Sequence, residues 1–373
     1  MLIDRLRTML ALALVLLAFG ARAEPVTLTD LTGRKVTLPA PARRIVLAQG
    51  RHLNALALLH PDPVSLVAGW GDDLKRDRAT YDLYRRRFPA IERVPDLGSG
   101  AARTFSLEKA ISLEPDLVVL SRFADGGGGA AQAGEVARRF EAIGVPVIVI
   151  DFFQAPLEET EASLRILGEA IGRPEAALAY NRFYREHLDR IAARLKAPGL
   201  ARPRVFMHAH AGGPTCCYSP GRGVFDQFIR AAGGHNIGAD ILPGATGELS
   251  PEYVASAKPD IYVGTGGTYQ IRSGGLVLGS GVSAEEARRS LAATLARLNL
   301  LAISSLPPER IHGMWQLFND TPVHVVAVEL LAKWLHPELF GDLDPAATLR
   351  EINERFLSVP LEGTYWTSLG GTE

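Results

Sequence analysis

The sequence predicts an α/β protein of two lobes, each built on a mainly parallel sheet and joined to the other by a long helical segment. Short apolar runs alternate with helix-forming stretches in both halves of the 373-residue chain. Continuous apolar strands of this kind are typical of parallel sheets that are covered on both faces. Between the halves, residues 157–197 favour helix almost throughout, and one sequence pattern occurs once in each half.

The first 23 residues have the layout of a secretory signal peptide. The start "MLIDRLR" has a small excess of basic side chains. It is followed by the apolar run "MLALALVLLAFG" and by "ARA", which fits a cleavage signal of small residues. The apolar run is well short of the ~20 residues that span a bilayer, which argues against a membrane anchor. We therefore expect export, cleavage near Ala23 and a soluble extracytoplasmic protein.

The mature chain, at about 350 residues, is longer than one ordinary domain. We divide the chain into a signal peptide (1–23), an N-terminal lobe (24–156), a connecting helix segment (157–198) and a C-terminal lobe (199–373). Hydrophobic residues make up 47% and charged residues 22%, which is a globular composition. The formal net charge of −1 gives no reason to expect a nucleic-acid partner.

Each lobe is predicted from its own strands and helices. In the N-terminal half, the expected strands are "RRIVLA" (43–48), "PVSLVAGW" (63–70), "DLVVLS" (116–121) and "VPVIVID" (145–151), with helices at "HLNALALL" and "AGEVARRFEAIG". In the C-terminal half, "RPRVFMHAH" (202–210) and "PDIYVG" (259–264) are expected strands, and "GVFDQFIRAAGG" (223–234) is an expected helix.

The connecting segment breaks once, at "GRP" (172–174), and Pro174 suits the first turn of the helix that follows. Apolar residues then recur near helical spacing. They are Ala177, Leu178, Tyr180, Phe183, Tyr184, Leu188 and Ile191. A long helix between two lobes is a stiffer connector than a pair of extended strands.

A repeated pattern relates the two lobes. "SLEKAISLEPDLVV" (106–119) and "SPEYVASAKPDIYV" (250–263) share serine, glutamate two residues later, Pro-Asp, and a final valine at the same spacing. Each is expected to be a short helix that runs into a strand. The separation is the size of a lobe, which indicates a duplication of the lobe and not a solenoid of short repeats.

Several stretches together resemble the substrate-binding proteins of ABC importers with a helical backbone, the class that serves ferric siderophores, haem and cobalamin. The stretches are 26–46, 106–120, the helix after Pro174, "AAGGHNIGAD" (231–240), 249–263, "PPERIHGMW" (307–315) and "VELLAKWLHPELF" (328–340). The resemblance implies two Rossmann-like lobes with the ligand between them, no catalysis, no cofactor, a periplasmic location and a monomer.

The same resemblance gives the repeat a role. In this class each lobe carries a surface glutamate that docks onto arginines of the permease dimer, and Glu108 and Glu252 are the matching residues. Complementary charge of this kind sets registry and encounter rate. The alternative is that both acids only stabilise the first turn of a helix.

Ligands of parallel α/β sheets gather where loops leave the carboxyl ends of the strands. The loops expected there are rich in arginine and in aromatic rings, which suit an anionic iron complex with an apolar rim. The candidate ligand contacts are Arg51, Trp70, Arg122, His210, Tyr218, Arg222, Tyr269, Arg272 and Trp315. A ferric siderophore is the ligand that we expect first.

Other ligands and another class of protein stay open. Haem would need an axial tyrosine or histidine, and Tyr81, Tyr84, Tyr218 and Tyr269 are available. A bare zinc or manganese site is disfavoured because the histidines are scattered, although His208 and His210 would share one face of a strand. The alternative class is an exported hydrolase with a cysteine or a serine nucleophile. A Cys217 nucleophile would need His208 or His210 beside it.

The only two cysteines are adjacent, Cys216 and Cys217. Their α-carbons are ~3.8 Å apart across a trans peptide, which is below the ~4.4–6.8 Å usual for disulfides. A bond between them would stiffen the turn, and two free thiols are the alternative.

Overall fold

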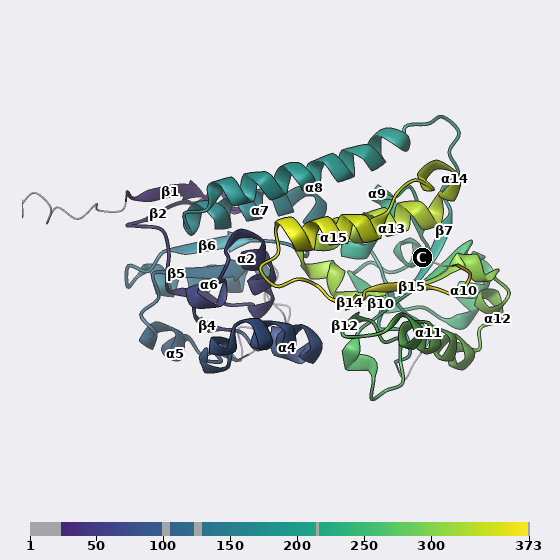
Figure 1. The fold of residues 1–373 in the computed structure, drawn as a ribbon, viewed down its shortest axis with the longest axis horizontal. Helices are drawn as coiled ribbons and strands as arrows, with labels where there is room; N and C mark the ends of the chain where they lie inside the picture. The colour runs from purple at the N-terminus through teal and green to yellow at the C-terminus, as the bar shows by residue number, and fades with distance from the viewer. Residues whose placement is uncertain (1–23, 99–104, 123–128, 214–215, 372–373) are drawn as a thin grey trace, which may run out of the picture.

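The computed structural model describes residues 24–98, 105–122, 129–213 and 216–371, so the expected signal peptide lies outside the described residues. Two α/β lobes lie side by side and a long helix, α8, runs along both (Figure 1). The predicted fold class is therefore confirmed.

The N-terminal lobe is a four-stranded parallel sheet in the order β4-β3-β5-β6. A β-hairpin, β1-β2, packs beside it. The elements are β1 (Val26–Thr29), β2 (Lys35–Leu38), β3 (Ile45–Leu47), α2 (Leu53–Leu59), β4 (Val67–Trp70), α3 (Asp73–Arg76), α4 (Arg78–Arg87), α5 (Leu107–Ser112), β5 (Leu117–Ser121), α6 (Gly129–Glu141) and β6 (Val147–Ile150).

The C-terminal lobe is a five-stranded sheet in the order β15-β13-β11-β7-β9, in which only β15 runs antiparallel to its neighbour. Its main elements are β7 (Arg204–His208), α9 (Val224–Ala231), β9 (His235–Asn236), α10 (Pro251–Ala257), β11 (Ile261–Gly266), η5 (Thr268–Gln270), α11 (Ala284–Leu298), α12 (Leu301–Ser304), β13 (Ile311–Trp315), η7 (Gln316–Asp320), α13 (Val325–Leu335), α14 (Pro337–Phe340), α15 (Pro345–Arg355) and β15 (Trp366–Ser368). Two small pairs, β8 (Tyr218–Pro220) with β10 (Thr246–Glu248) and β12 (Gly279–Ser280) with β14 (Gly363–Thr364), complete it.

The repeated sequence pattern has the same structure in both lobes. In each lobe a short helix (α5 or α10) leads into an inner strand (β5 or β11). The aspartate of Pro-Asp accepts hydrogen bonds from the backbone at the start of the neighbouring strand. The Asp116 carboxylate accepts hydrogen bonds from the backbone N–H groups of Arg43 and Arg44 at 2.7 and 2.9 Å. Asp260 accepts one from the N–H of Arg204 at 2.7 Å. The shared Pro-Asp therefore ties the start of the neighbouring strand to the inner strand in both sheets.

The connecting segment consists of two helices, α7 (Pro156–Ala170) and α8 (Pro174–Arg194), which pack against each other. Helix α8 contacts α2 in the N-terminal lobe and α13 in the C-terminal lobe. The apolar positions of α8 that face the protein include Tyr180, Phe183, Tyr184 and Ile191, all buried. Burial of this face fixes α8 against both lobes.

The end of the chain also crosses between the lobes. The Ala57 carbonyl lies in the last turn of α2, and the residue four positions later is Pro61, which has no N–H to offer it. The backbone N–H and the hydroxyl of Ser358 supply these hydrogen bonds instead, at 2.9 and 3.1 Å. A residue near the C-terminus thus completes a helix of the N-terminal lobe.

A buried polar pair joins α8 to α13. The His187 Nδ1 atom lies 2.6 Å from Glu329 Oε1, and the exposed fractions of the two residues are 8% and 1%. We expect Glu329→Leu to lower the free energy of unfolding by about 2 kcal/mol, because it leaves a buried imidazole nitrogen without a partner. Urea denaturation followed by circular dichroism measures this effect. Glu329→Gln, which keeps an acceptor for His187, is the control and should lose much less; equal losses would contradict the assignment.

Candidate ligand-binding cleft

Loops that follow the carboxyl ends of strands in both sheets meet at the boundary between the lobes. Arg51, after β3, pairs with Asp320, after β13. Thr268, after β11, donates to Asp77, which follows β4. Loops that leave these ends bring Arg51 and Arg122 from the N-terminal lobe and His210, Tyr269 and Trp315 from the C-terminal lobe. The expected gathering place of the ligand contacts is thus built from both lobes.

Three of the candidate residues form one exposed group, which we call the ring cluster: His210, Tyr218 and Tyr269. The His210 Nδ1 atom lies 2.7 Å from the Tyr269 hydroxyl, and the two ring centres are 5.6 Å apart. The Tyr218 ring centre is 6.2 Å from that of His210. Tyr218 and Tyr269 are 37% and 40% exposed. Exposed rings held together in this way offer apolar area and hydrogen-bonding tips to a ligand.

The backbone around His210 explains why this histidine is exposed. Strand β7 ends at His208, and His210 has a left-handed backbone with φ 52°. Its N–H donates to Thr265 Oγ1 at 3.1 Å, which fastens the turn to β11. The expectation that His208 and His210 share a face is therefore wrong: the strand ends between them, and His208 is only 3% exposed and lies against Tyr262.

Each tyrosine of the ring cluster is held in place by its backbone and by a hydrogen bond of its hydroxyl group. Tyr218 lies in β8, which pairs with β10, and its hydroxyl is 2.6 Å from Thr246 Oγ1. Tyr269 lies in η5, directly after β11, and its hydroxyl meets His210. The cluster is therefore positioned before any ligand arrives, which lowers the conformational entropy lost on binding.

Desolvation affects the pKa of two members of the ring cluster, His210 and Tyr269. Desolvation lowers the pKa of His210 below its ordinary value, so the imidazole is neutral. Desolvation and then the negative charge of Asp77 raise the pKa of Tyr269, so its phenol keeps its proton. His210 and Tyr269 can consequently donate and accept hydrogen bonds without carrying charge.

The four candidate arginines divide into two kinds. Arg51 pairs with Asp73 at 2.9 Å and, across the lobe boundary, with Asp320 at 2.7 Å. Arg122 pairs with Glu159 and donates to the Leu31 carbonyl at 2.7 Å. These two guanidinium groups are engaged by the protein itself.

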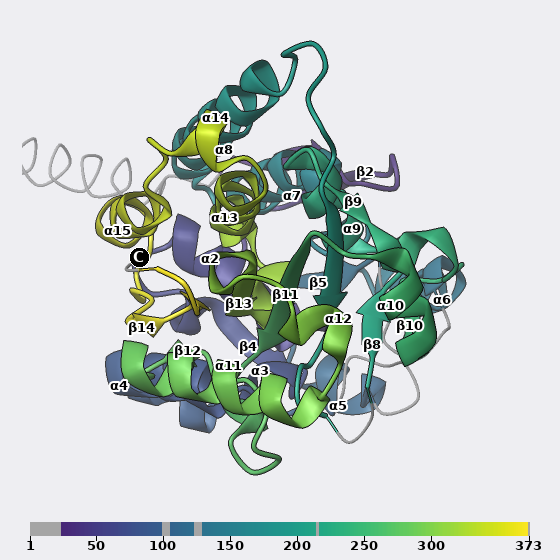
Figure 2. The same cartoon turned by 90° about the vertical axis from the view of Figure 1, so that its right-hand side faces the viewer.

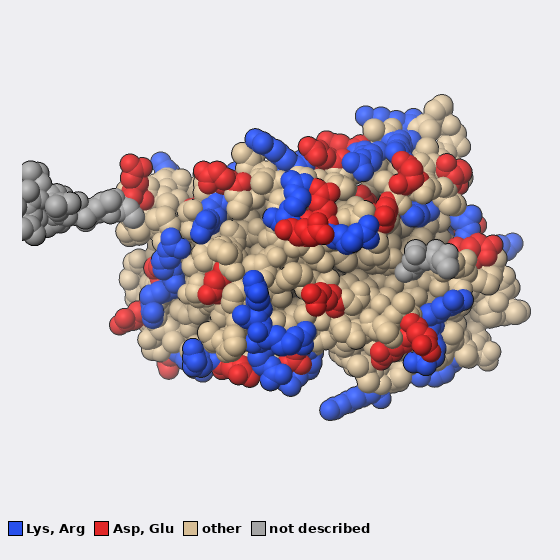
Figure 3. Space-filling model, in the orientation of Figure 1, with Lys and Arg blue, Asp and Glu red and all other residues tan. Residues whose placement is uncertain are grey.

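Arg222 and Arg272 are exposed, and neither forms an ion pair with a carboxylate of the described residues. The Arg222 side chain donates only to the Ala239 carbonyl, at 3.4 Å. These two remain available to an anionic ligand, and both belong to the C-terminal lobe. Elsewhere, on the face drawn in Figure 3, basic and acidic side chains are interspersed over both lobes.

The structure places the two candidate tryptophans in the interior. Trp70 is 0% exposed and Trp315 is 2% exposed. Trp315 packs edge-on against Phe318 and Tyr365, with ring centres 5.5 and 5.0 Å apart. In this arrangement neither indole presents a surface to the cleft, and both support the loops that do.

Two further contacts between the lobes involve residues that the sequence analysis did not single out. Thr268 donates to Asp77 Oδ1 at 3.1 Å, and Gln227 donates to the Gln154 carbonyl at 2.6 Å. Burial raises the pKa of Asp77. In the sequence, Asp77 is recognisable only as an aspartate that precedes a helix, before "RAT". This pattern does not indicate a partner in the other lobe.

Glu108 and Glu252 occupy equivalent places on the two lobes. Each lies in the first turn of its helix, α5 or α10, and each is exposed. Figure 2 shows both helices in the right-hand half of the molecule. The two acids therefore hold matching positions on the two lobes.

The sulfur atoms of Cys216 and Cys217 are bonded to each other. Cys217 is fully buried and precedes the ring-cluster residue Tyr218, so the pair shapes the loop that presents that tyrosine. We expect the native protein to contain no free thiol. Mass spectrometry after alkylation, with and without prior reduction, measures this, and labelled cysteine in the unreduced, denatured protein would contradict it.

Within the described ranges, no three His, Cys, Asp or Glu side chains converge on a point that would hold a metal ion. Among the same residues, no helix combines the length and apolar content that crossing a bilayer requires.

The chain matches the family model "Periplasmic binding protein" over residues 55–279. A curated relative, the "Cobalamin-binding protein" of Halobacterium salinarum, is 25% identical over 244 residues, which are 64% of this chain. The aligned part spans 58% of that relative's own length.

Solved structures agree with this match. The TroA-like periplasmic binding protein FepB from Veillonella parvula is 25% identical with a TM-score of 0.83, covering 93% of this chain and 100% of that one. The haem-binding protein RhuT from Roseiflexus sp. RS-1, at 21% identity, covers 79% of this chain and 98% of its own with a TM-score of 0.54, and shares the fold. The family and the fold are those of transport substrate-binding proteins and not of enzymes. The chain belongs to the periplasmic binding protein family.

Proposed function

We propose that this protein is a periplasmic receptor that binds a ferric siderophore between its lobes and delivers it to an ABC importer of the inner membrane. The observation that carries the proposal is the ring cluster, which lies exposed at the carboxyl ends of β7 and β11. Arg222 and Arg272 lie in loops of the same lobe and supply positive charge without internal ion pairs among the described residues.

The chemistry of the cleft suits a large anionic complex with an apolar rim. Neutral phenol and imidazole groups donate hydrogen bonds to oxygen atoms of the ligand, and their rings cover its apolar edges. Guanidinium groups add charge-assisted hydrogen bonds. The protein performs no reaction on the ligand; it binds, encloses and releases it.

Cobalamin is the second candidate, and the named curated relative favours it. A corrinoid is also large, with polar amide groups around an apolar ring, so the ring cluster would serve it in a similar way. It carries no comparable anionic rim, however, and would leave Arg222 and Arg272 without a defined role.

Optical titration of the purified protein tests the proposal. Ferric catecholate and ferric hydroxamate siderophores, cobalamin and haem are added separately, and tryptophan fluorescence and visible absorption are recorded. We expect saturable binding of one ferric siderophore and much weaker binding of the rest. Saturation by cobalamin or a sharp haem band shift, without a siderophore response, would overturn the first choice.

The connection between the lobes predicts a small hinge motion on ligand binding. Helix α8 packs on both lobes, and Arg51–Asp320 and Asp77–Thr268 contacts already join them. Wide closure would have to break this packing. We expect small-angle scattering profiles of the free and ligand-bound protein to superimpose closely. A large decrease in radius of gyration on binding would contradict the prediction.

A further inference from the structure

An aspartate of the N-terminal lobe contacts the residue that precedes Tyr269 of the ring cluster. Asp77 lies between α3 and α4 and is only 6% exposed. Its Oδ1 atom accepts a hydrogen bond at 3.1 Å from the hydroxyl of Thr268, which belongs to the C-terminal lobe. Helix α4 also packs against η5 and β12 (Figure 1), so this contact is part of a broader junction between the lobes.

Both neighbours of Tyr269 in η5 are held by hydrogen bonds. Thr268 donates to Asp77, and Gln270, which is 6% exposed, donates from its side chain to the His210 carbonyl at 3.0 Å. The four residues that follow, 271–274, are all exposed. The short segment that carries the Tyr269 ring is thus held on one side by its own lobe and on the other by Asp77.

The orientation of the Asp77 carboxylate is set within the N-terminal lobe. Its Oδ2 atom accepts a hydrogen bond from the hydroxyl of Thr80, and the backbone N–H groups of Ala79 and Thr80 stabilise its negative charge. Oδ1 is therefore presented to Thr268 in a defined direction. The charge of Asp77 also acts on Tyr269, because desolvation and then this carboxylate raise the pKa of the Tyr269 phenol. Contact and charge both link Asp77 to the ring cluster.

We propose that Asp77 is a positioning residue of the ligand site: through Thr268 it fixes Tyr269 in the place where its ring meets the ligand. The inference rests on the proposed function, because the position of Tyr269 matters to binding only if its ring contacts the ligand. All three rings of the cluster belong to the C-terminal lobe, yet their arrangement then depends on the N-terminal lobe. Asp77 acts through Tyr269 and not by touching the ligand.

Nitrogen NMR of the isotope-labelled, ligand-free protein tests the structural link. The His210 Nδ1 atom lies 2.7 Å from the Tyr269 hydroxyl, so its signal reports that hydrogen bond, and its absence from His210→Gln assigns it. Thr268→Val keeps the shape of the side chain and removes the donor to Asp77, and we expect it to shift the His210 signal. Thr268→Ser, which keeps a hydroxyl, should leave the signal nearly unchanged. An unchanged signal in Thr268→Val would overturn the inference.

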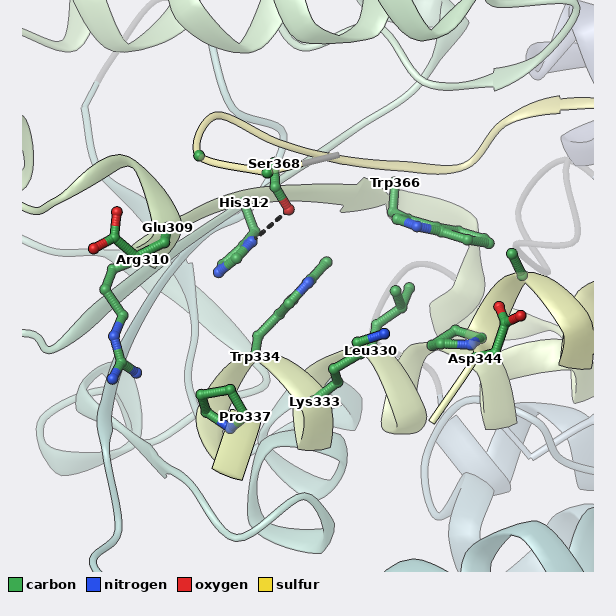
Figure 4. A pocket seen from close by; sticks show the side chains of 14 residues that line it. Glu309, Arg310, His312, Leu330, Lys333, Trp334, Pro337, Asp344, Trp366 and Ser368 are labelled. Carbon is green, nitrogen blue, oxygen red and sulfur yellow. Dashed lines mark hydrogen bonds between the residues drawn. The ribbon is translucent and has the colours of Figure 1, made fainter. Parts of the chain in front are cut away.

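His312 provides an internal control in the same spectra. It lies in a pocket of the C-terminal lobe, stacked on Trp334, and its Nδ1 atom is 2.7 Å from Ser368 Oγ (Figure 4). This hydrogen bond has the same length as that of His210 and also a hydroxyl partner, but it does not involve η5. The His312 signal should keep its position in both Thr268 variants. If it moves together with the His210 signal, the change spreads through the lobe and the positioning role is wrong.

The affinity for an iron complex tests the functional link. The probe is the ferric catecholate or ferric hydroxamate siderophore that saturates the unaltered protein in the optical titration. We expect Thr268→Val to lower its affinity about fivefold, which is the effect of one hydrogen bond, and Thr268→Ser to lower it by less than about twofold. Asp77→Ala should lose as much affinity as Thr268→Val, and the two changes together should lose no more than either alone.

Combination with the ring-cluster variants separates this inference from the proposed function. In Tyr269→Ala, the added change Thr268→Val should cause no further loss, because the ring that it positions is absent. In Tyr218→Ala, the same addition should keep its full effect. A loss that persists without the Tyr269 ring would contradict the inference and leave the proposed function intact. Unchanged affinity in Tyr269→Ala alone would remove that ring from the ligand site and sink both. Circular dichroism establishes that each variant is folded, and if Asp77→Ala is not, the Thr268 variants decide.

Discussion

Replacing Tyr218 and Tyr269 together by alanine is expected to lower the affinity for the ferric siderophore by about 100-fold. Both rings are exposed, and both are held against His210 before the ligand binds. Aromatic residues at the centre of a binding site commonly contribute on the order of 1–2 kcal/mol each, and 1.4 kcal/mol is a factor of ten in affinity. Fluorescence titration with the siderophore identified in the optical screen measures the change.

The matched control retains the rings and removes only the hydroxyls. Tyr218→Phe with Tyr269→Phe loses the contacts to Thr246 and His210 but keeps the apolar area. We expect this variant to lose at most about 30-fold in affinity and to bind more tightly than the alanine variant, since two neutral hydrogen bonds contribute about 1 kcal/mol each. If the alanine variant binds as tightly as the phenylalanine variant, the ring cluster does not contact the ligand.

Reversing Glu108 and Glu252 to lysine should abolish ligand uptake in cells while leaving ligand affinity unchanged. Both acids are exposed in the first turns of α5 and α10. Lysines at these positions would repel the permease arginines that the docking proposal invokes, and like charges brought together at an interface cost several kcal/mol. Uptake of radiolabelled iron by cells that depend on this receptor gives the readout, and we expect a decrease of at least about tenfold.

Glu92→Lys with Glu285→Lys is the control for a change of net charge. These residues are also exposed acids, one on each lobe, with side chains 55% and 77% exposed. Their reversal changes the charge of the protein equally and should leave uptake near its original level. Normal uptake by the Glu108 and Glu252 variant would show that the repeat has only a structural role. Equal loss in both variants would indicate a dependence on net charge alone.

The parts of the fold that could be predicted from the sequence are those set by local patterns. The apolar runs before Gln49, Arg122 and Asp151 mark three of the parallel strands, and Pro174 marks the start of the long connecting helix. The repeat identified equivalent helix-strand units because Pro-Asp performs the same local task in each lobe. These features depend on neighbouring residues or on one face of a helix.

The candidate site was harder to predict because burial and pairing depend on distant parts of the chain. Trp70 and Trp315 have the composition of ligand contacts, yet the packing of the loops encloses both. Arg51 faces Asp320 from the other lobe, a partnership that no local pattern indicates. Only the loops with Tyr218 and Tyr269 fulfilled the expectation of exposure, and their meeting at His210 depends on where β7 ends.

The hydrogen bonds between Ser358 and Ala57 have a consequence for the order in which the molecule can assemble. As the chain is synthesised, the C-terminal turn of α2 stays incomplete until almost every other residue has been added. The first lobe therefore cannot reach its final stability as an independent unit, although it is built around its own sheet. An isolated fragment of residues 24–156 would lack the hydrogen bonds from Ser358. In the whole protein these bonds join the C-terminal residues to the first lobe, and we expect the two lobes to unfold together.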